Sequence, residues 1–255
     1  MYYLSIGAIF KNESLIMREW IEHYIFHGVN HFYLINDNSS DDFISILQPY
    51  IDKGIVTLFQ HTSPWDYYLG RQKDMYNYFI FPYLHETQWL FIADLDEYLW
   101  SPMSIDLKYT LQQCEHIGQI QIKDYLFGSN GYLLQPSSII QSFTKRSHSM
   151  TEGGTKYIIN TNFQFKELTI HYAFFTNKHD EDNHFILLGS PYFQVNHYSS
   201  QSQEYWEKIK CTRGDCDNWR IRTISDFELV DLNDVDDMGL YEQNRPLFST
   251  FKSLH

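Results

Sequence analysis

The residues best suited to chemistry are Asp94, Asp96 and Glu97, which fall within the run WLFIADLDEYL at residues 89–99. An uninterrupted run of Trp, Leu, Phe and Ile is typical of a strand buried on both faces, which places these carboxylates at or just beyond its C-terminal end. Ligands of open α/β sheets bind at that edge. Carboxylate oxygens favour Mg²⁺ or Mn²⁺, usually shared with substrate phosphates. The structural alternative is helix capping by aspartate.

Composition limits the kinds of protein that this chain can be. Its 255 residues are 43% hydrophobic and 18% aromatic, so we expect one compact domain spanning residues 1–255. The net charge of −13 argues against a nucleic-acid binder, which needs a basic face. A small anionic ligand remains compatible with this charge if a metal ion and a few local cations hold it. The candidate cations are Lys11, Arg71, Lys73, Lys156 and Arg213.

Cysteine usage and hydropathy bear on the compartment. Cys114, Cys211 and Cys216 are odd in number and lack CxxC spacing, so neither a disulfide framework nor a zinc cluster is indicated. The N-terminus has no basic region before its apolar stretch and does not resemble a signal peptide. No segment approaches the roughly 20 apolar residues of a membrane span. We therefore expect a cytoplasmic protein without a transmembrane segment, with peripheral association at the inner face of a membrane as an extension of that expectation.

Hydrophobic periodicity predicts alternating strands and helices in the first hundred residues. Helical spacing begins after Ser14 and stops at Gly28, and similar signals mark the later helices. The predicted strands are 2–10, 31–35, 55–59 and the run before Asp94, and the predicted helices are 14–27, 44–53 and 70–84. This order implies right-handed crossovers and a mainly parallel α/β sheet with a ligand crevice along one edge.

The second half of the chain shows weaker alternation. A helix is predicted over 105–114, a strand over 117–122, and a helix over 202–209, with short strands near Tyr157, Leu168 and Phe193. These segments indicate β-rich and helical additions to the sheet, where acceptor specificity would reside.

Three loops should meet at the carboxyl edge of the sheet. They are Lys11-Asn12-Glu13 after the first strand, residues 36–41 after the second, and residues 94–97 after the fourth. Asp37 and Asn38 can hydrogen-bond a base or the hydroxyls of a ribose. Capping of a helix is the alternative for residues 37–41, and both interpretations hold if Asp41 caps while Asp37 binds.

The opening FKNESLIMREWIEHYIFHGVNHFYLINDNSSDD resembles glycosyltransferase family 92 and its relatives in the family-2-like GT-A group. The shared features are a KNE start, an EWIEHH-like helix, a GV-x-H-x-Y strand and a D-N-x-S-x-D loop. Further matches follow in order: Gln72, ADLDEYL at 93–99, FGSNG at 127–131, VNHY at 195–198, and Arg213-Gly214. The resemblance covers about residues 4–215 and is strongest in the first hundred.

This resemblance implies a GT-A-type, Rossmann-like fold in which residues 1–100 bind a nucleotide-sugar and residues 101–255 bind the acceptor. It implies that Asp96 is a direct metal ligand and that Asp94 contacts the ribose or a metal-bound water. His197 would complete the shell of an Mn²⁺ or Mg²⁺ ion. The residues implied to bind the donor are Lys11, Asn12, Glu13, Asp37, Asn38, Gln72, Asp94 and Lys156.

The implied activity is transfer of a hexose from a UDP- or GDP-sugar to a glycan or glycolipid, such as a lipopolysaccharide. The resemblance favours inversion, which needs a carboxylate to deprotonate the acceptor hydroxyl. Asp124 and Glu204 are the two candidates for this base, and Glu97 is expected to brace the turn. The chain departs from the family near residue 123, where relatives often carry Trp and this sequence has Lys-Asp.

Two other interpretations remain open at this point. An inactive member of the family would bind sugars through its many aromatic side chains without turnover. A phosphatase of the haloacid dehalogenase type also places Asp-x-Asp after an apolar strand. That group carries its nucleophilic Asp on the first strand and usually Thr or Val two residues after the second Asp, whereas here three strands precede the motif and Tyr98 takes that place.

Overall fold

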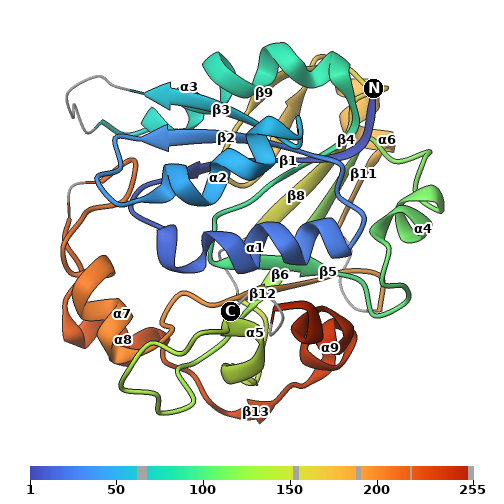
Figure 1. Cartoon of the computed structure of the whole chain (residues 1–255). Helices are drawn as coiled ribbons and strands as arrows, with labels where there is room; N and C mark the ends of the chain where they lie inside the picture. The colour runs from blue at the N-terminus through green and yellow to red at the C-terminus, as the bar shows by residue number, and fades with distance from the viewer. Residues whose placement is uncertain (62–67, 152–154, 188–190, 219, 252–255) are drawn as a thin grey trace.

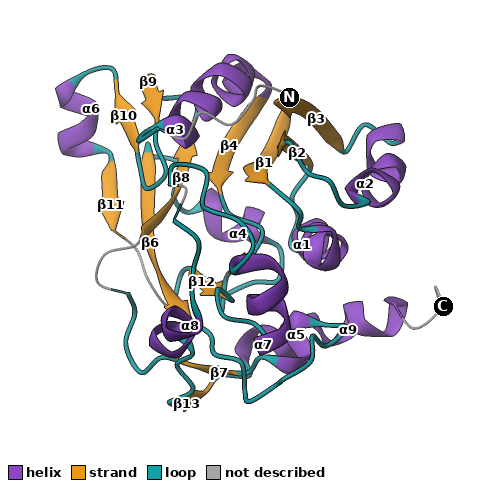
Figure 2. Ribbon diagram, turned by 90° about the vertical axis from the view of Figure 1, so that its left-hand side faces the viewer, coloured by secondary structure: helices purple, strands orange, loops and turns teal. Residues whose placement is uncertain are grey.

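The computed structural model describes residues 1–61, 68–151, 155–187, 191–218 and 220–251. Helices cover both faces of one large mixed sheet (Figures 1 and 2). This is the α/β architecture that the sequence predicted. No helix in the described ranges is long and apolar enough to cross a membrane.

The described part of the chain alternates strands and helices to residue 100 and becomes richer in short strands afterwards. The strands are β1 Tyr2–Phe10, β2 His31–Asp37, β3 Val56–His61, β4 Thr87–Ile92, β5 Glu97–Trp100, β6 Gln119–Leu126, β7 Lys145–Arg146, β8 Thr155–Asn160, β9 Phe165–Leu168, β10 Ala173–Phe175, β11 Phe185–Leu187, β12 Gln194–His197 and β13 Val235–Asp236. The α-helices are α1 Ser14–Phe26, α2 Phe43–Asp52, α3 Arg71–Met75, α4 Leu107–Gln112, α5 Ile139–Ser142, α6 Lys178–Asn183, α7 Gln203–Tyr205, α8 Ile224–Val230 and α9 Gly239–Phe251. The π-helical segments are η1 Tyr76–Ile80 and η3 Trp206–Lys210, and η2 Phe81–Glu86 is a 3₁₀-helix.

The sheet order β3-β2-β1-β4-β8-β6-β12-β5 explains where a site can form. Strands β3, β2, β1 and β4 are parallel, so their carboxyl ends meet at one edge. Beyond β4 the sheet becomes mixed, because β8 is antiparallel to both β4 and β6. Strand β12 then pairs with β6 and β5, and this register sets His197 opposite Glu97. A residue far along the chain is thereby brought beside the Asp-x-Asp turn.

The core follows from the alternation of apolar side chains along the strands. On β1, Leu4, Ile6 and Ala8 pack with the buried residues of α1 and α2, whereas Ile9 packs on the other face with α3 and η1. Helix α1 contributes Trp20, whose Nε1 donates a hydrogen bond to the main-chain oxygen of Glu97 at 3.0 Å. Helix α1 therefore supports the turn that carries Asp94, Asp96 and Glu97.

Residues 70–84, predicted as one helix, form three helical segments in succession. Helix α3 passes into the π-helical η1 and then into the 3₁₀-helix η2, which has a proline in its first turn. Pro82 lacks an N–H donor and its ring obstructs a continuing helical ladder, which accounts for the change from η1 to the 3₁₀-helix η2. The buried face is preserved across the first two segments through Met75, Tyr76 and Ile80.

Asp41 caps a helix, although not the one that follows it. Its Oδ2 accepts a hydrogen bond of 2.7 Å from the main-chain N of Ser14, the first residue of α1. The capping expected within residues 37–41 is made by Asp41 and ties the loop after β2 to the loop after β1.

A buried histidine pair joins α1 to α9. Asn244 accepts from His27 through its side-chain oxygen at 2.7 Å, and its amide nitrogen lies 2.9 Å from Nδ1 of His23. All three side chains are fully buried. Burial lowers the pKa of both histidines below the usual value of 6.5.

We expect this pair to make folding sensitive to acid. Because burial lowers both pKa values, the unfolded chain binds more protons than the folded chain below about pH 6.5, and the free energy of unfolding falls as the pH is lowered through that region. Each histidine contributes at most about 1.4 kcal/mol per pH unit. Urea unfolding at about pH 7.5 and about pH 5.5 should show a smaller loss for His27→Gln than for wild type. Equal losses would contradict this assignment.

Candidate functional site

A pocket of about 500 Å³ opens at the carboxyl ends of the parallel strands. Its far wall is the segment that follows α7, between Trp206 and Asn218. Eight residues singled out from the sequence as donor-binding residues, metal ligands or cations line it together: Lys11, Glu13, Asp37, Gln72, Asp94, Asp96, His197 and Arg213. The convergence of three loops at one sheet edge is thus confirmed.

The turn after β4 presents its two aspartates differently. The side chain of Asp94 is 38% exposed, whereas that of Asp96 is 7% exposed. Glu97 braces the turn as expected, because its Oε2 accepts a 3.0 Å hydrogen bond from the main-chain N of Asp94. Burial raises the pKa of Glu97 to about 7. Asp94 therefore faces the open part of the pocket, and Asp96 lies deeper.

Each aspartate of the motif contacts a buried lysine. Nζ of Lys156 lies 2.8 Å from Oδ2 of Asp94 and 3.1 Å from Oε2 of Glu97. Nζ of Lys210 lies 2.7 Å from Oδ2 of Asp96. Burial alone would raise the pKa of Asp96, but the charges of Lys210 and His197 outweigh it and hold that pKa below its usual range. Asp96 is consequently an anion with one oxygen, Oδ1, left on the side of His197.

His197 is held between two carboxylates. Its Nδ1 lies 2.7 Å from Oδ2 of Asp124, and its Nε2 lies 3.7 Å from Oδ1 of Asp96. Asp124 also accepts a hydrogen bond from the hydroxyl of Thr151. Although burial would lower the pKa of His197, the bond to Asp124 and the charge of Asp96 raise it to about 9.

The arrangement around His197 fits a divalent cation. A carboxylate that fixes one ring nitrogen while the other faces a second ligand is the usual support of a metal-binding histidine. Asp96 Oδ1 and His197 Nε2 are the two atoms that would hold the ion, which would displace the proton from Nε2 on binding. One imidazole with carboxylate oxygens is a donor set compatible with Mn²⁺.

Asp37 lies in the pocket wall, but Arg71 occupies both of its oxygens. The two guanidinium nitrogens lie 2.6 and 3.0 Å from the carboxylate, and each side chain is 3% exposed. The same guanidinium contacts Sγ of Cys216 at 3.1 Å. Burial raises the pKa of the Cys216 thiol to about 12, so this cysteine stays protonated and contributes packing.

Other predicted residues take supporting positions. The side-chain oxygen of Asn12 accepts from the main-chain N of Ser40 at 2.7 Å and so joins two of the loops. Asn38 has a positive φ of 54° in that second loop. Lys156 is a buried counterion, neither a solvated surface group nor an open cation. None of these three is among the described residues that line the pocket.

The two candidates for the base also lie outside the pocket lining among the described residues. Asp124 bonds His197, as given above. Glu204 accepts from the main-chain N of Gln135 at 2.8 Å and pairs with Nζ of Lys208 at 2.6 Å. Its charge is thus directed toward a neighbouring loop and its own helix.

In the wall formed by residues 206–218, the sequence had singled out Arg213 and Gly214 but not Lys210 or Asp217. Lys210 lines the pocket at the end of η3, and Asp217 accepts from the main-chain N of Gly70 and Gln72 at the start of α3. Arg213 lines the same wall and forms a buried ion pair with Glu13. A π-helix shifts side chains relative to the 3.6-residue period, so the position of Lys210 could not be read from spacing.

The fold and site define an α/β protein with an acidic ligand pocket at the carboxyl ends of its parallel strands. A sequence model of glycosyltransferase family 92 matches residues 2–233, and the chain belongs to that family. The resemblance found in the sequence is thus confirmed.

Two relatives illustrate the similarity. Galactan beta-1,4-galactosyltransferase GALS3 of Arabidopsis thaliana is 27% identical over 112 residues, which is 42% of this chain and 22% of that protein. A glycosyltransferase family 92 protein of Ricinus communis is 20% identical over 132 residues, which is 50% of this chain and 23% of that protein. The matched segments therefore cover less than a quarter of these relatives.

Among solved structures, S. aureus TarS 1–349 in complex with UDP-GlcNAc superposes with a TM-score of 0.47 at 14% identity. The superposition covers 98% of this chain and 73% of that one.

Proposed function

We propose that this chain transfers a sugar from a UDP- or GDP-sugar to a glycan or glycolipid acceptor, with inversion at the anomeric carbon and dependence on Mn²⁺ or Mg²⁺. The observation that carries the proposal is the pairing of Asp96 Oδ1 with His197 Nε2 at 3.7 Å inside the pocket. Membership of glycosyltransferase family 92 supports the reaction class.

The residues divide the work according to their positions. Asp96 and His197 would hold the divalent cation, which supplies a Lewis acid for the departing diphosphate when it is bound. Asp94 is the more exposed carboxylate, which suits contact with the ribose or with a metal-bound water. Lys210 and Arg213 are the cations of the wall opposite the sheet edge, and each is already paired with a carboxylate, Lys210 with Asp96 and Arg213 with Glu13.

Asp124 supports this proposal as a positioning residue. Its carboxylate fixes Nδ1 of His197 and leaves Nε2 facing Asp96. Loss of such a partner typically weakens metal binding by about 10–100-fold. We expect Asp124→Asn to weaken Mn²⁺ binding by that factor in calorimetric titration, and turnover to fall with it.

The matched control is Glu204→Gln. Glu204 was the other candidate for the base, and its side chain contacts Gln135 and Lys208 and neither of the proposed metal ligands, Asp96 and His197. This variant should bind Mn²⁺ and nucleotide as wild type does. A large loss of turnover with unchanged binding would identify Glu204 as the base; unchanged Mn²⁺ binding in Asp124→Asn would refute the positioning role.

A thermal shift tests the donor site directly. We expect Mn²⁺ with UDP or GDP to raise the melting temperature of the wild-type protein, since a ligand at 100 times its Kd stabilises the folded state by about 2.7 kcal/mol. The preferred base is the one that gives the larger shift. Absence of any shift with either nucleotide, with and without Mn²⁺, would refute a nucleotide-sugar site.

The remaining alternatives are separated by turnover. An inactive member would show the nucleotide-dependent shift without transfer or hydrolysis of a labelled nucleotide-sugar. A haloacid-dehalogenase-type phosphatase disagrees with the family and with the topology, because the Asp-x-Asp turn follows β4 and the nucleophile of that group lies on the first strand.

A further inference from the structure

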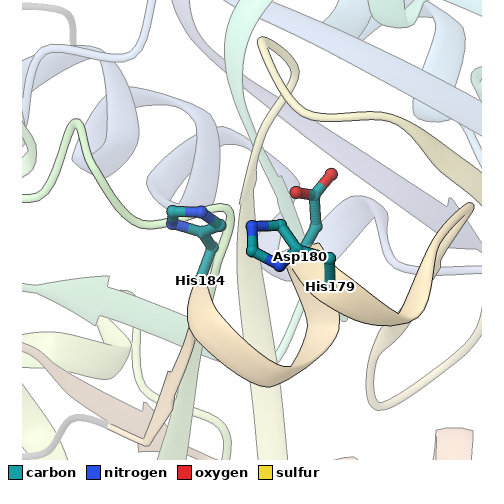
Figure 3. A group of neighbouring side chains, drawn as sticks. All are labelled: His179, Asp180 and His184. Atoms are coloured by element: carbon teal, nitrogen blue, oxygen red, sulfur yellow. The ribbon is translucent and has the colours of Figure 1, made fainter.

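A second cluster of metal-ligating side chains lies at α6, near the start of β6. Ligand atoms of His179, Asp180 and His184 all lie within 4.8 Å of one another. Figure 3 shows the two imidazole rings next to each other, with the Asp180 side chain beside His179. Their ring centroids are 6.2 Å apart. None of these residues lines the pocket described above.

His184 is held rigidly in this cluster. Its Nδ1 lies 2.8 Å from the main-chain oxygen of His116, and a carbonyl can only accept, so Nδ1 carries the proton. Nε2 is therefore the nitrogen with the lone pair. The ring also packs against Phe163, with centroids 4.7 Å apart, and the main-chain oxygen of His184 accepts from Gly118 and Gln119. This is the support that metal-binding histidines usually have.

The other two members are placed by the helix itself. Asp180 and His184 are four residues apart, and the main-chain N of His184 donates to the oxygen of Asp180 at 2.8 Å. Asp180 uses Oδ2 to accept from Asn177, so Oδ1 is on hand as a ligand. His179 is exposed, and its Nδ1 lies 3.3 Å from the side-chain nitrogen of Asn183.

We propose that His179, Asp180 and His184 bind one divalent transition-metal ion, which ties α6 to the start of β11. Two imidazoles with one carboxylate are a ligand set typical of Zn²⁺ with a water in the fourth position. Hard cations such as Mg²⁺ prefer oxygen ligands, so this site would be chemically distinct from one built around Asp96.

Titration of the EDTA-treated full chain with ZnCl₂ in a calorimeter tests the proposal. We expect His179→Gln and His184→Gln each to lose one equivalent of Zn²⁺, or to bind it at least about 10-fold more weakly than wild type. His85→Gln is the matched control, because His85 is also exposed and its Nδ1 contacts a main-chain oxygen at 2.8 Å, yet it belongs to no such cluster. It should titrate as wild type does.

Two further measurements separate this site from the donor site and from misfolding. His179 is exposed, so its replacement leaves the core intact, and circular dichroism should match that of wild type. The Mn²⁺-dependent nucleotide shift should persist in His179→Gln. Zn²⁺ isotherms for both cluster variants that superimpose on the wild-type isotherm would overturn the proposal.

Discussion

Asp96→Asn is expected to lower sugar transfer by about 10²–10³-fold and to abolish the Mn²⁺-dependent part of the nucleotide thermal shift. The amide keeps the shape of the side chain but removes the negative charge that would face the cation. The substitution removes the carboxylate that lies 2.7 Å from Nζ of Lys210. Asn is preferable to Ala as the replacement, because its side-chain oxygen can still accept a hydrogen bond from Lys210. Turnover of a labelled nucleotide-sugar and thermal shift with Mn²⁺ and nucleotide measure the two effects.

Asp236→Asn is the control, since Asp236 is exposed on β13 and does not line the pocket. It should leave both measurements unchanged. An undiminished Mn²⁺-dependent shift in a folded Asp96→Asn protein would exclude Asp96 as a ligand.

The largest stability effect is expected at the Asp37–Arg71 pair. Arg71→Met removes the guanidinium from a carboxylate that is 3% exposed, and breaking a buried pair in this way typically costs about 3–5 kcal/mol. His61, whose Nδ1 lies 3.4 Å from Oδ1 of Asp37, is the nearest replacement partner. Urea denaturation measures the change in the free energy of unfolding.

Lys73→Met is the matched control on the same helix. Its partner Glu167 lies at 2.9 Å, but both side chains are about one-third exposed, and exposed pairs contribute at most about 1 kcal/mol. The double variant Asp37→Leu with Arg71→Met should recover much of the lost stability, because no uncompensated charge remains. If the recovered double variant still binds nucleotide as wild type does, Asp37 has no part in donor binding.

Much of the site could be predicted from residues close together in the sequence. Asp94 and Asp96 follow a short apolar run that is typical of a strand buried on both faces, so their position at the sheet edge was predictable. The first three strands were recognisable as short apolar runs that end in polar or turn residues, and the first two helices were recognisable from apolar residues at helical spacing. Helix 70–84 was less predictable, since a proline changes the hydrogen-bond pattern without changing the apolar face.

What the sequence by itself determined is the α/β order, the carboxyl-edge loops, the family and the Asp-x-Asp turn, because these depend on residues close together in the chain. Only the tertiary structure decided which lysines neutralise the two aspartates. Lys156 contacts Asp94 across 62 residues of sequence, and Lys210 contacts Asp96 across 114. It also decided that Asp124 orients His197, through the pairing of β12 with β6. Long-range strand pairing and the pairing of buried charges depend on which strands become neighbours. The hydrophobic periodicity of the sequence does not specify these neighbours.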